Sequence, residues 1–177
     1  MNEHLSNTAF RLMALAFRVK DLFSRRTDIL AEFEMMEGMH VVDYGCGPGS
    51  YLRAASRLVG KTGLVTAVDI HPLAIQAVNE RAFRLGLTNV MGLLTRGYDT
   101  PLDDHSVHIV YAMDMFHMVD DPTAMLTDIR RILVPEGVLF MDSGHQPDET
   151  ARKKITDSGQ FTIQRTTDRY FQCRPEP

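Results

Sequence analysis

The stretch VVDYGCGPGSYLRAA, from Val41 to Ala55, changes character twice within a short span. Its first residues are branched and apolar, as in a strand covered on both faces, and the strand ends near Asp43. Glycines then occupy alternate positions, at Gly45, Gly47 and Gly49. Glycine permits a tight turn and a close approach of a ligand to the backbone, and the start of the following helix favours an anion. The stretch therefore predicts a strand, a ligand-binding turn and a helix.

The spacing of the glycines distinguishes between two kinds of ligand. A dinucleotide-binding turn has the pattern G-x-G-x-x-G, whereas this chain has Ser50 where the third glycine of that pattern should stand. Asp43 is poorly placed against a pyrophosphate and well placed beside a cationic group. Asp69, at the end of the next strand-like run, has the spacing of a carboxylate that binds a ribose diol. As alternatives, Asp43 forms the turn, Asp69 caps the next helix, and Ile70 packs in the core instead of against a base.

Apolar strand-like runs alternate with helical patterns through the middle of the chain. The runs are Met39–Tyr44, Leu64–Ile70, Asn89–Leu94, Val107–Ala112 and Gly137–Asp142. The helical patterns are Ser50–Val59, Pro72–Leu85 and Pro122–Leu133. Strict alternation predicts a doubly wound α/β fold with a parallel sheet. After Asp142 the sequence predicts a short helix over Asp148–Ser158 and an antiparallel hairpin made of FTIQRTT and RYFQCRP.

Two amphipathic helices are predicted before the sheet. The first runs from Thr8 to Phe23, and the second begins at Thr27, buries Ile29, Phe33 and Met36, and ends at Gly38. We predict a single domain over residues 1–177, with N-terminal helices in 1–38, a ligand-binding core in 39–142 and the C-terminal helix and hairpin in 143–177.

Composition excludes several functional classes. The chain has 44% apolar and 24% charged residues and a formal charge of −4, which argues against nucleic-acid binding. Cys46 and Cys173 are far apart, so a disulfide framework is not expected, and no run has the length of a membrane span or the pattern of a signal peptide. We expect a cytoplasmic protein without a membrane partner.

The motifs together resemble those of the class I S-adenosylmethionine-dependent methyltransferases, especially the type resembling quinone-biosynthesis methyltransferases. The segments that carry the resemblance are GMHVVDYGCGPGSY, GLVTAVDIHPLAIQAV, LDDHSVHIVYAMDMFHMVDDP and LTDIRRILVPEGVLFMD. It implies a seven-stranded Rossmann-like sheet with the C-terminal antiparallel hairpin last. It also implies S-adenosylmethionine as cofactor and S-adenosylhomocysteine as product.

The resemblance assigns a set of residues to the cofactor. Asp43 and the glycine turn surround the methionine end, Asp69 holds the ribose, and Ile70 with Gly97 and Tyr98 brackets the adenine. The full set of implied cofactor-binding residues is Asp43, Gly45, Cys46, Gly47, Gly49, Asp69, Ile70, Arg96, Gly97, Tyr98 and Met113. The chain departs from the family at Arg96, where an acidic residue for the adenine amino group is usual, with Asp99 as a substitute. It also has His108 where an aspartate is common.

Methyl transfer from a sulfonium is an in-line displacement, so alignment of the reactants carries most of the catalysis. A base is needed only where the acceptor must lose a proton. The candidates are His117 and Asp114, with Asp142 and His145 further along the chain; His117 titrates near neutral pH and suits a phenol, thiol or amine. The alternative is that His117 packs against the cofactor or caps a turn. The spacing of these groups matches no metal site, so no metal is expected.

Few residues outside the predicted sheet could cover a substrate. We therefore predict a small-molecule acceptor in a shallow pocket or in one completed by a homodimer, with the N-terminal helix as a lid or as plain core packing. Two other functions stay open from the sequence: a non-catalytic protein that binds S-adenosylmethionine, and a nicotinamide-dependent oxidoreductase.

Overall fold

The structure is a computed structural model that describes residues 6–12, 14–15 and 26–176. Its strands form a seven-stranded sheet in the order β3-β2-β1-β4-β5-β7-β6. This order and the alternating helices confirm the predicted α/β fold with a mostly parallel sheet. The chain divides into two compact units, one ending at Leu94 and one beginning at Thr95.

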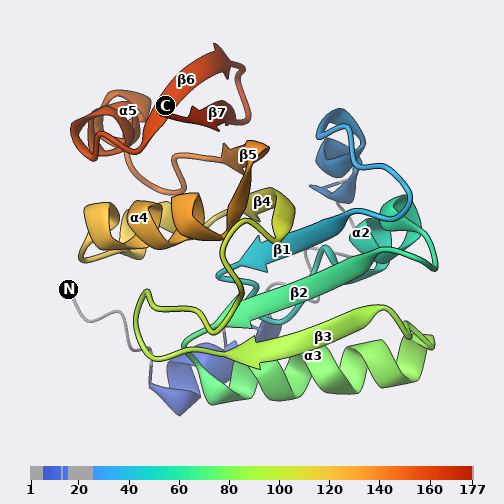
Figure 1. Ribbon diagram of the computed structural model, residues 1–177. Helices are drawn as coiled ribbons and strands as arrows, with labels where there is room; N and C mark the ends of the chain where they lie inside the picture. The colour runs from blue at the N-terminus through green and yellow to red at the C-terminus, as the bar shows by residue number, and fades with distance from the viewer. Residues whose placement is uncertain (1–5, 13, 16–25, 177) are drawn as a thin grey trace. The chain divides into compact units, whose positions relative to one another are not determined.

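The N-terminal unit contains the parallel strands β1 (His40–Tyr44), β2 (Leu64–Asp69) and β3 (Val90–Leu94). Helix α2 (Leu52–Val59) packs against β1 and β2, and α3 (Pro72–Leu85) packs against β2 and β3 (Figure 1). Because the strands are parallel, the carboxyl ends of β1 and β2 lie at one edge, and Tyr44 pairs with Val68. This arrangement brings the residues that follow each strand together.

Helix α3 begins and ends where the sequence predicts. Pro72 occupies its first turn, where a missing N–H costs nothing, and the His71 Nδ1 atom accepts a hydrogen bond from Leu73 N at 3.2 Å. Gly86 ends the helix in the left-handed conformation. The alternative that Asp69 caps this helix is wrong, because His71 is the capping residue.

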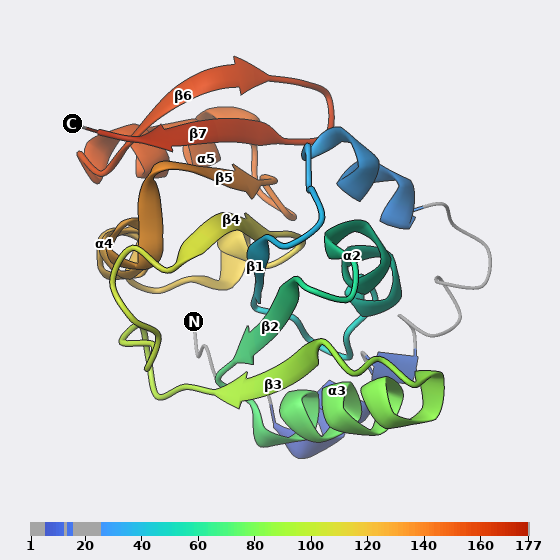
Figure 2. The same cartoon turned by 45° about the vertical axis from the view of Figure 1, so that its right-hand side comes forward.

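The C-terminal unit contains β4 (Val107–Ala112) and β5 (Leu133–Met141), which are parallel. Strand β7 (Phe171–Pro175) pairs antiparallel with both β5 and β6 (Phe161–Thr166), which confirms the predicted hairpin (Figure 2). The helices are η2 (Phe116–Met118), α4 (Pro122–Ile132) and α5 (Asp148–Asp157). Helix α5 contacts both α4 and β6.

The segment before β1 differs from its prediction. Residues 7–12, 14 and 15 are helical, and the rest of the predicted Thr8–Phe23 helix lies outside the described residues, as does the side chain of Thr27. The second predicted helix is a 3₁₀ helix, η1 (Arg26–Glu32), and Met36 is 62% exposed while Met35 is buried. The 3₁₀ helix ends at Glu32, so Met36 lies beyond it and helical spacing does not set its burial.

Candidate active site

Asp69, at the end of β2, joins the glycine turn to its own strand. Its Oδ2 atom accepts a hydrogen bond from Gly47 N at 2.9 Å, and its Oδ1 atom accepts one from His71 N at 2.8 Å. Burial raises the pKa of Asp69, although the His71 and Gly47 N–H groups act in the opposite direction. The two elements that the sequence linked only by spacing are therefore in direct contact.

The glycine turn uses most of its own hydrogen-bond donors. Gly45 N and Cys46 N both donate to Val68 O, at 2.9 and 3.0 Å, and Gly49 N donates to Cys46 O at 3.0 Å. These three N–H groups of the turn are therefore paired within the protein. The glycines provide shape instead, because Gly45, Gly47 and Gly49 all have positive φ angles, of 74°, 50° and 76°.

Two of these glycines differ in their surroundings. A Cβ atom on Gly49 would lie 2.5 Å from Leu52 Cδ1 and 3.3 Å from Val78 Cγ2, so α2 and α3 require a glycine there. A Cβ atom on Gly47 would meet nothing within 4 Å, so the backbone is open at that point. Gly49 therefore serves packing, whereas Gly47 faces open space.

Buried polar groups surround the turn. Asp43 is 2% exposed, and Ser50 Oγ is buried without a hydrogen-bond partner among the described residues. Burial, and then the nearby Asp69 and Asp43, raise the pKa of the Cys46 thiol well above its ordinary value. Cys46 therefore stays a neutral thiol. Ile70, directly after β2, is half-buried.

The remaining predicted cofactor residues lie in the C-terminal unit. Gly97 has a φ of 78°, and a Cβ atom on it would meet nothing within 4 Å. The Tyr98 hydroxyl accepts a hydrogen bond from Asp121 N at 3.3 Å. The Arg96 and Asp99 side chains are exposed. Tyr98 is therefore hydrogen-bonded to the residue that precedes α4, and Arg96 lies on the surface.

Asp142 connects the segments that follow β4 and β5. Its Oδ1 atom accepts hydrogen bonds from Asp114 N at 2.8 Å and from Gly144 N at 3.0 Å. Asp114 has a φ of 63°, a conformation that aspartate tolerates better than most residues, and Met113 before it is buried. The carboxylate of Asp142 therefore shapes the backbone beneath the predicted catalytic residues.

His117 lies in η2, beside these segments. Its ring centroid is 4.6 Å from that of His145 at an angle of 41°, and a Cβ atom on Gly144 would overlap His117 Nδ1. That nitrogen is buried and has no hydrogen-bond partner within the described part of the chain. Burial lowers the pKa of His117, as do His145 and Lys154, whereas Asp114 raises it. The imidazole is therefore neutral at pH 7 and able to accept a proton.

A family model described as a methyltransferase domain matches residues 42–141, more than half of the chain. The chain belongs to the class I S-adenosylmethionine-dependent methyltransferase family. The family match includes the glycine turn, Asp69 and His117, so the resemblance inferred from the motifs is confirmed. The oxidoreductase alternative is correspondingly disfavoured.

Individual methyltransferases are similar to this chain in sequence or in fold. Over 150 residues, the chain is 28% identical to the ubiquinone/menaquinone biosynthesis C-methyltransferase UbiE of Pseudoalteromonas translucida, covering 84% of this chain and 59% of that protein. The demethylmenaquinone methyltransferase of Staphylococcus aureus is 26% identical over 69% of this chain and 50% of that protein. A solved S-adenosylmethionine-dependent methyltransferase of Aquifex aeolicus has a TM-score of 0.78 and 26% identity, covering 92% of this chain and 97% of that one. The chain thus spans about half the length of the curated relatives.

Several contacts in this chain were not predicted from the sequence. The Phe10 ring stacks on His71 at 4.4 Å, with 14° between the planes, which attaches the described part of the N-terminal helix to the end of β2. Asp142 and His145 were only secondary candidates, and the contacts of Arg131 with the loop before β4 were not predicted. An acidic residue directly after a strand was the available signal for Asp142.

Two features are absent from the described residues. They contain no helix long and apolar enough to cross a membrane. They also contain no group of three or more His, Cys, Asp or Glu side chains arranged to hold a metal ion.

Proposed function

We propose that the chain transfers a methyl group from S-adenosylmethionine to a small-molecule acceptor by in-line displacement. The observation that carries the proposal is the hydrogen bond between Asp69 Oδ2 and Gly47 N, at 2.9 Å. This contact holds the glycine turn against the acidic end of β2, which supports a site for a ligand with an amino acid end and a ribose.

The residues around the turn fit this cofactor. Asp43 suits the cationic end of the methionine group, the open backbone at Gly47 admits a ligand, and Ser50 Oγ is a buried polar atom available for a hydrogen bond. Asp69 suits the ribose, because each carboxylate oxygen keeps a further lone pair after its backbone contact. Ile70 contributes an apolar surface for the adenine.

Further cofactor contacts are proposed in the C-terminal unit. We propose that Gly97 and Tyr98 contact the adenine and that Met113 contacts the methyl donor. When bound, S-adenosylmethionine supplies a sulfonium methyl group, and S-adenosylhomocysteine is left after transfer.

We propose that His117 accepts a proton from the acceptor. A neutral imidazole accepts the proton of an acceptor hydroxyl group. The methyl group then goes either to the hydroxyl oxygen or to a carbon of the ring that carries the hydroxyl. Lys154 Nζ lies 5.3 Å from the centroid of the Phe116 ring, next to His117, and adds positive charge that favours an acidic hydroxyl such as a phenol. The relatives named for quinone biosynthesis make aromatic hydroxyl compounds the first acceptors to test. We propose Asp114 as a second, weaker candidate for the base.

Calorimetric titration tests the cofactor assignment. We expect S-adenosylmethionine and S-adenosylhomocysteine to bind, and NAD to give no heat. Tight binding of NAD with no response to either sulfur compound would overturn the proposal.

Mass spectrometry tests the transfer reaction. We expect a gain of one methyl group on a reduced quinone or simple phenol, accompanied by S-adenosylhomocysteine. Binding of the cofactor without any methylated product from phenols, thiols or amines would instead support a non-catalytic binding protein.

Organisation and location are proposed on separate grounds. Cys46 and Cys173 are free and buried, which supports a reducing, cytoplasmic environment. We also propose a single domain and, because few described residues lie outside the sheet and its helices, a homodimer that completes the acceptor pocket. Light scattering on the purified protein tests the dimer, and a monomer mass at working concentration would contradict it.

A further inference from the structure

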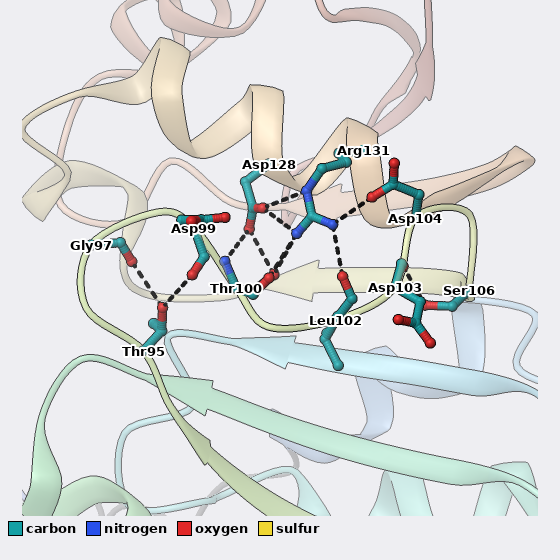
Figure 3. A network of polar contacts seen from close by, with 10 residues as sticks. All are labelled: Thr95, Gly97, Asp99, Thr100, Leu102, Asp103, Asp104, Ser106, Asp128 and Arg131. Carbon is teal, nitrogen blue, oxygen red and sulfur yellow. Dashed lines mark hydrogen bonds and ion pairs between the residues drawn. The ribbon is translucent and has the colours of Figure 1, made fainter.

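The loop between β3 and β4 is attached to α4 by two side chains, Asp128 and Arg131 (Figure 3). Asp128 is 6% exposed, and its Oδ2 atom accepts hydrogen bonds from Thr100 Oγ1 at 2.8 Å and from Thr100 N at 3.3 Å. A buried carboxylate with these partners holds the backbone of the loop at residue 100.

Arg131 extends this attachment along the loop. Its Nη1 atom donates to Leu102 O and to Asp104 Oδ1, each at 2.7 Å, and its Nη2 atom donates to Thr100 O at 2.7 Å. Nε and Nη2 also donate to Asp128 Oδ1, at 3.1 and 2.7 Å. Every N–H group of the guanidinium therefore has an acceptor, and the planar fork matches three loop residues at once.

The start of the same loop is held near the other end of α4. Asp121, the N-cap of α4, donates its N–H to the Tyr98 hydroxyl at 3.3 Å. The Thr95 hydroxyl shares its one hydrogen between Gly97 O, at 3.3 Å, and Asp99 O, at 3.2 Å, which closes the turn between them (Figure 3). One helix thus supports both ends of the loop that carries Gly97 and Tyr98.

We infer that Arg131, oriented by Asp128, is a positioning residue for the adenine end of the cofactor. The inference rests on the proposed contacts of Gly97 and Tyr98 with adenine. The loop has no strand or helix of its own, so hydrogen bonds from Arg131 to its carbonyl groups take the place of regular backbone pairing. Without them, the loop keeps fewer constraints and the turn at Gly97 samples other positions, which weakens cofactor binding without removing any contact to the cofactor.

A variant at Arg131 is expected to fold. His105 N donates to Arg131 O at 3.0 Å, and Ser106 N donates to Ile132 O at 2.9 Å, so the end of the loop stays attached through backbone atoms. Arg131→Met keeps the aliphatic length of the side chain and removes its donors. Arg130 offers a matched control on the same helix, because its Nη2 atom donates to Glu176 O at 2.6 Å, far along the chain from the loop.

Calorimetric titration with S-adenosylhomocysteine, at a temperature where circular dichroism shows each variant folded, tests the inference. We expect Arg131→Met to bind about tenfold more weakly and Arg130→Met to stay within about twofold of the original protein. In assays, the KM for S-adenosylmethionine should rise while kcat at saturation changes little. A lower melting temperature with unchanged affinity would show a merely structural role and overturn the inference.

A double-mutant cycle with Tyr98→Ala separates this inference from the proposed function. If Arg131 acts through the turn, the combined variant loses less affinity than the product of the two single losses. If Tyr98→Ala alone leaves affinity unchanged, the proposed role of Tyr98 in the adenine site is wrong. If Tyr98→Ala weakens binding and the two losses multiply, the adenine assignment stands and the positioning role of Arg131 is wrong.

Discussion

At the scale of single residues, the side chain of Asp69 has one structural role and one proposed functional role. It holds the glycine turn through Gly47 N and is proposed to bind the ribose. Burial raises the pKa of this carboxyl group, because the buried ionised form costs free energy. Replacing Asp69 removes that cost, which partly offsets the stability lost with its hydrogen bonds. Function therefore depends on Asp69 more strongly than stability does.

Replacement of Asp69 tests this balance. We expect Asp69→Ala to weaken binding of S-adenosylhomocysteine by about 10- to 100-fold, because it removes charge-assisted hydrogen bonds, while the chain stays folded. Asp157→Ala, at an exposed ion pair with Lys153, is the control and should bind normally. Unchanged affinity in Asp69→Ala would show that the ribose assignment is wrong.

Gly47 and Gly49 have different surroundings, so replacing each with alanine should lower the free energy of unfolding by a different amount. Gly47→Ala and Gly49→Ala each place a side chain at positive φ, which costs about 1–2 kcal/mol. Gly49→Ala also forces Cβ against Leu52 and Val78, which adds about 1–3 kcal/mol to the loss in free energy of unfolding. Urea denaturation measures both. In titrations, Gly47→Ala should lose affinity for S-adenosylhomocysteine, since its methyl group enters the open space. Equal stability of the two variants would contradict this account.

The environment of His117 predicts the pH dependence of methyl transfer. Its lowered pKa keeps the ring neutral at pH 7, so the rate should fall only as the pH drops below the ordinary histidine range near 6.5. His145→Gln removes one of the causes that lower this pKa, so the acid limb should move to higher pH. Lys154 and Asp114 act on the same ring in opposite directions. If the pH profile of kcat/KM has the same acid limb in the original protein and in His145→Gln, then His145 does not affect the pKa of His117.

At the scale of elements, α4 links stability to the site. It begins at Asp121, whose Oδ1 atom accepts a hydrogen bond from Ala124 N at 2.9 Å, and it ends with the Arg131 contacts. The helix is therefore both part of the fold and a support for the loop that precedes β4.

Removal of the cap on α4 should be measurable. We expect Asp121→Ala to lower the free energy of unfolding by about 1 kcal/mol, because the first turn loses an acceptor for a backbone N–H. Asp121→Asn keeps an acceptor and should stay close to the original protein. Urea denaturation compares the two, and equal losses would show that the side chain does not act as a cap.

Element boundaries were predictable where the local chemistry is strong. Helix α3 matches its prediction, Pro72–Leu85, because proline suits its first turn and Gly86 ends it in the left-handed conformation. Strand β4 likewise matches at Val107–Ala112. The helix predicted to run to Gly38 is a 3₁₀ helix that ends at Glu32. Ile29 and Phe33 are buried as predicted, but apolar spacing alone does not determine the type or the end of a short helix. Strand β5 begins at Leu133, earlier than predicted.

At the scale of the whole molecule, the two cysteines report on the two units separately. Cys46 lies in the N-terminal unit and Cys173 in the C-terminal unit, and both are buried. Burial raises the pKa of Cys173 to about 12, and the charge of Arg152 acts in the opposite direction. Neither thiol should react with an alkylating reagent in the folded protein.

Labelling during denaturation tests the predicted single domain. We expect both cysteines to become reactive over one urea transition that coincides with the loss of helical circular dichroism, as in two-state unfolding. Mass spectrometry of peptides containing each cysteine distinguishes the two sites. Exposure of one thiol at a lower urea concentration than the other would show two domains of separate stability.

The sequence by itself determined the order of the elements, the fold class and the pairing of a glycine turn with an acidic strand end. These depend on local periodicity and on the special backbone preferences of glycine and proline, which act within a few residues. Only the tertiary structure decided the hydrogen bond from Gly47 to Asp69, the ring contact of His117 with His145, and the attachment of the loop before β4 through Arg131. Each of these joins residues far apart in the chain, and their distances depend on which strand ends become neighbours and in which register. Local patterns do not encode that geometry.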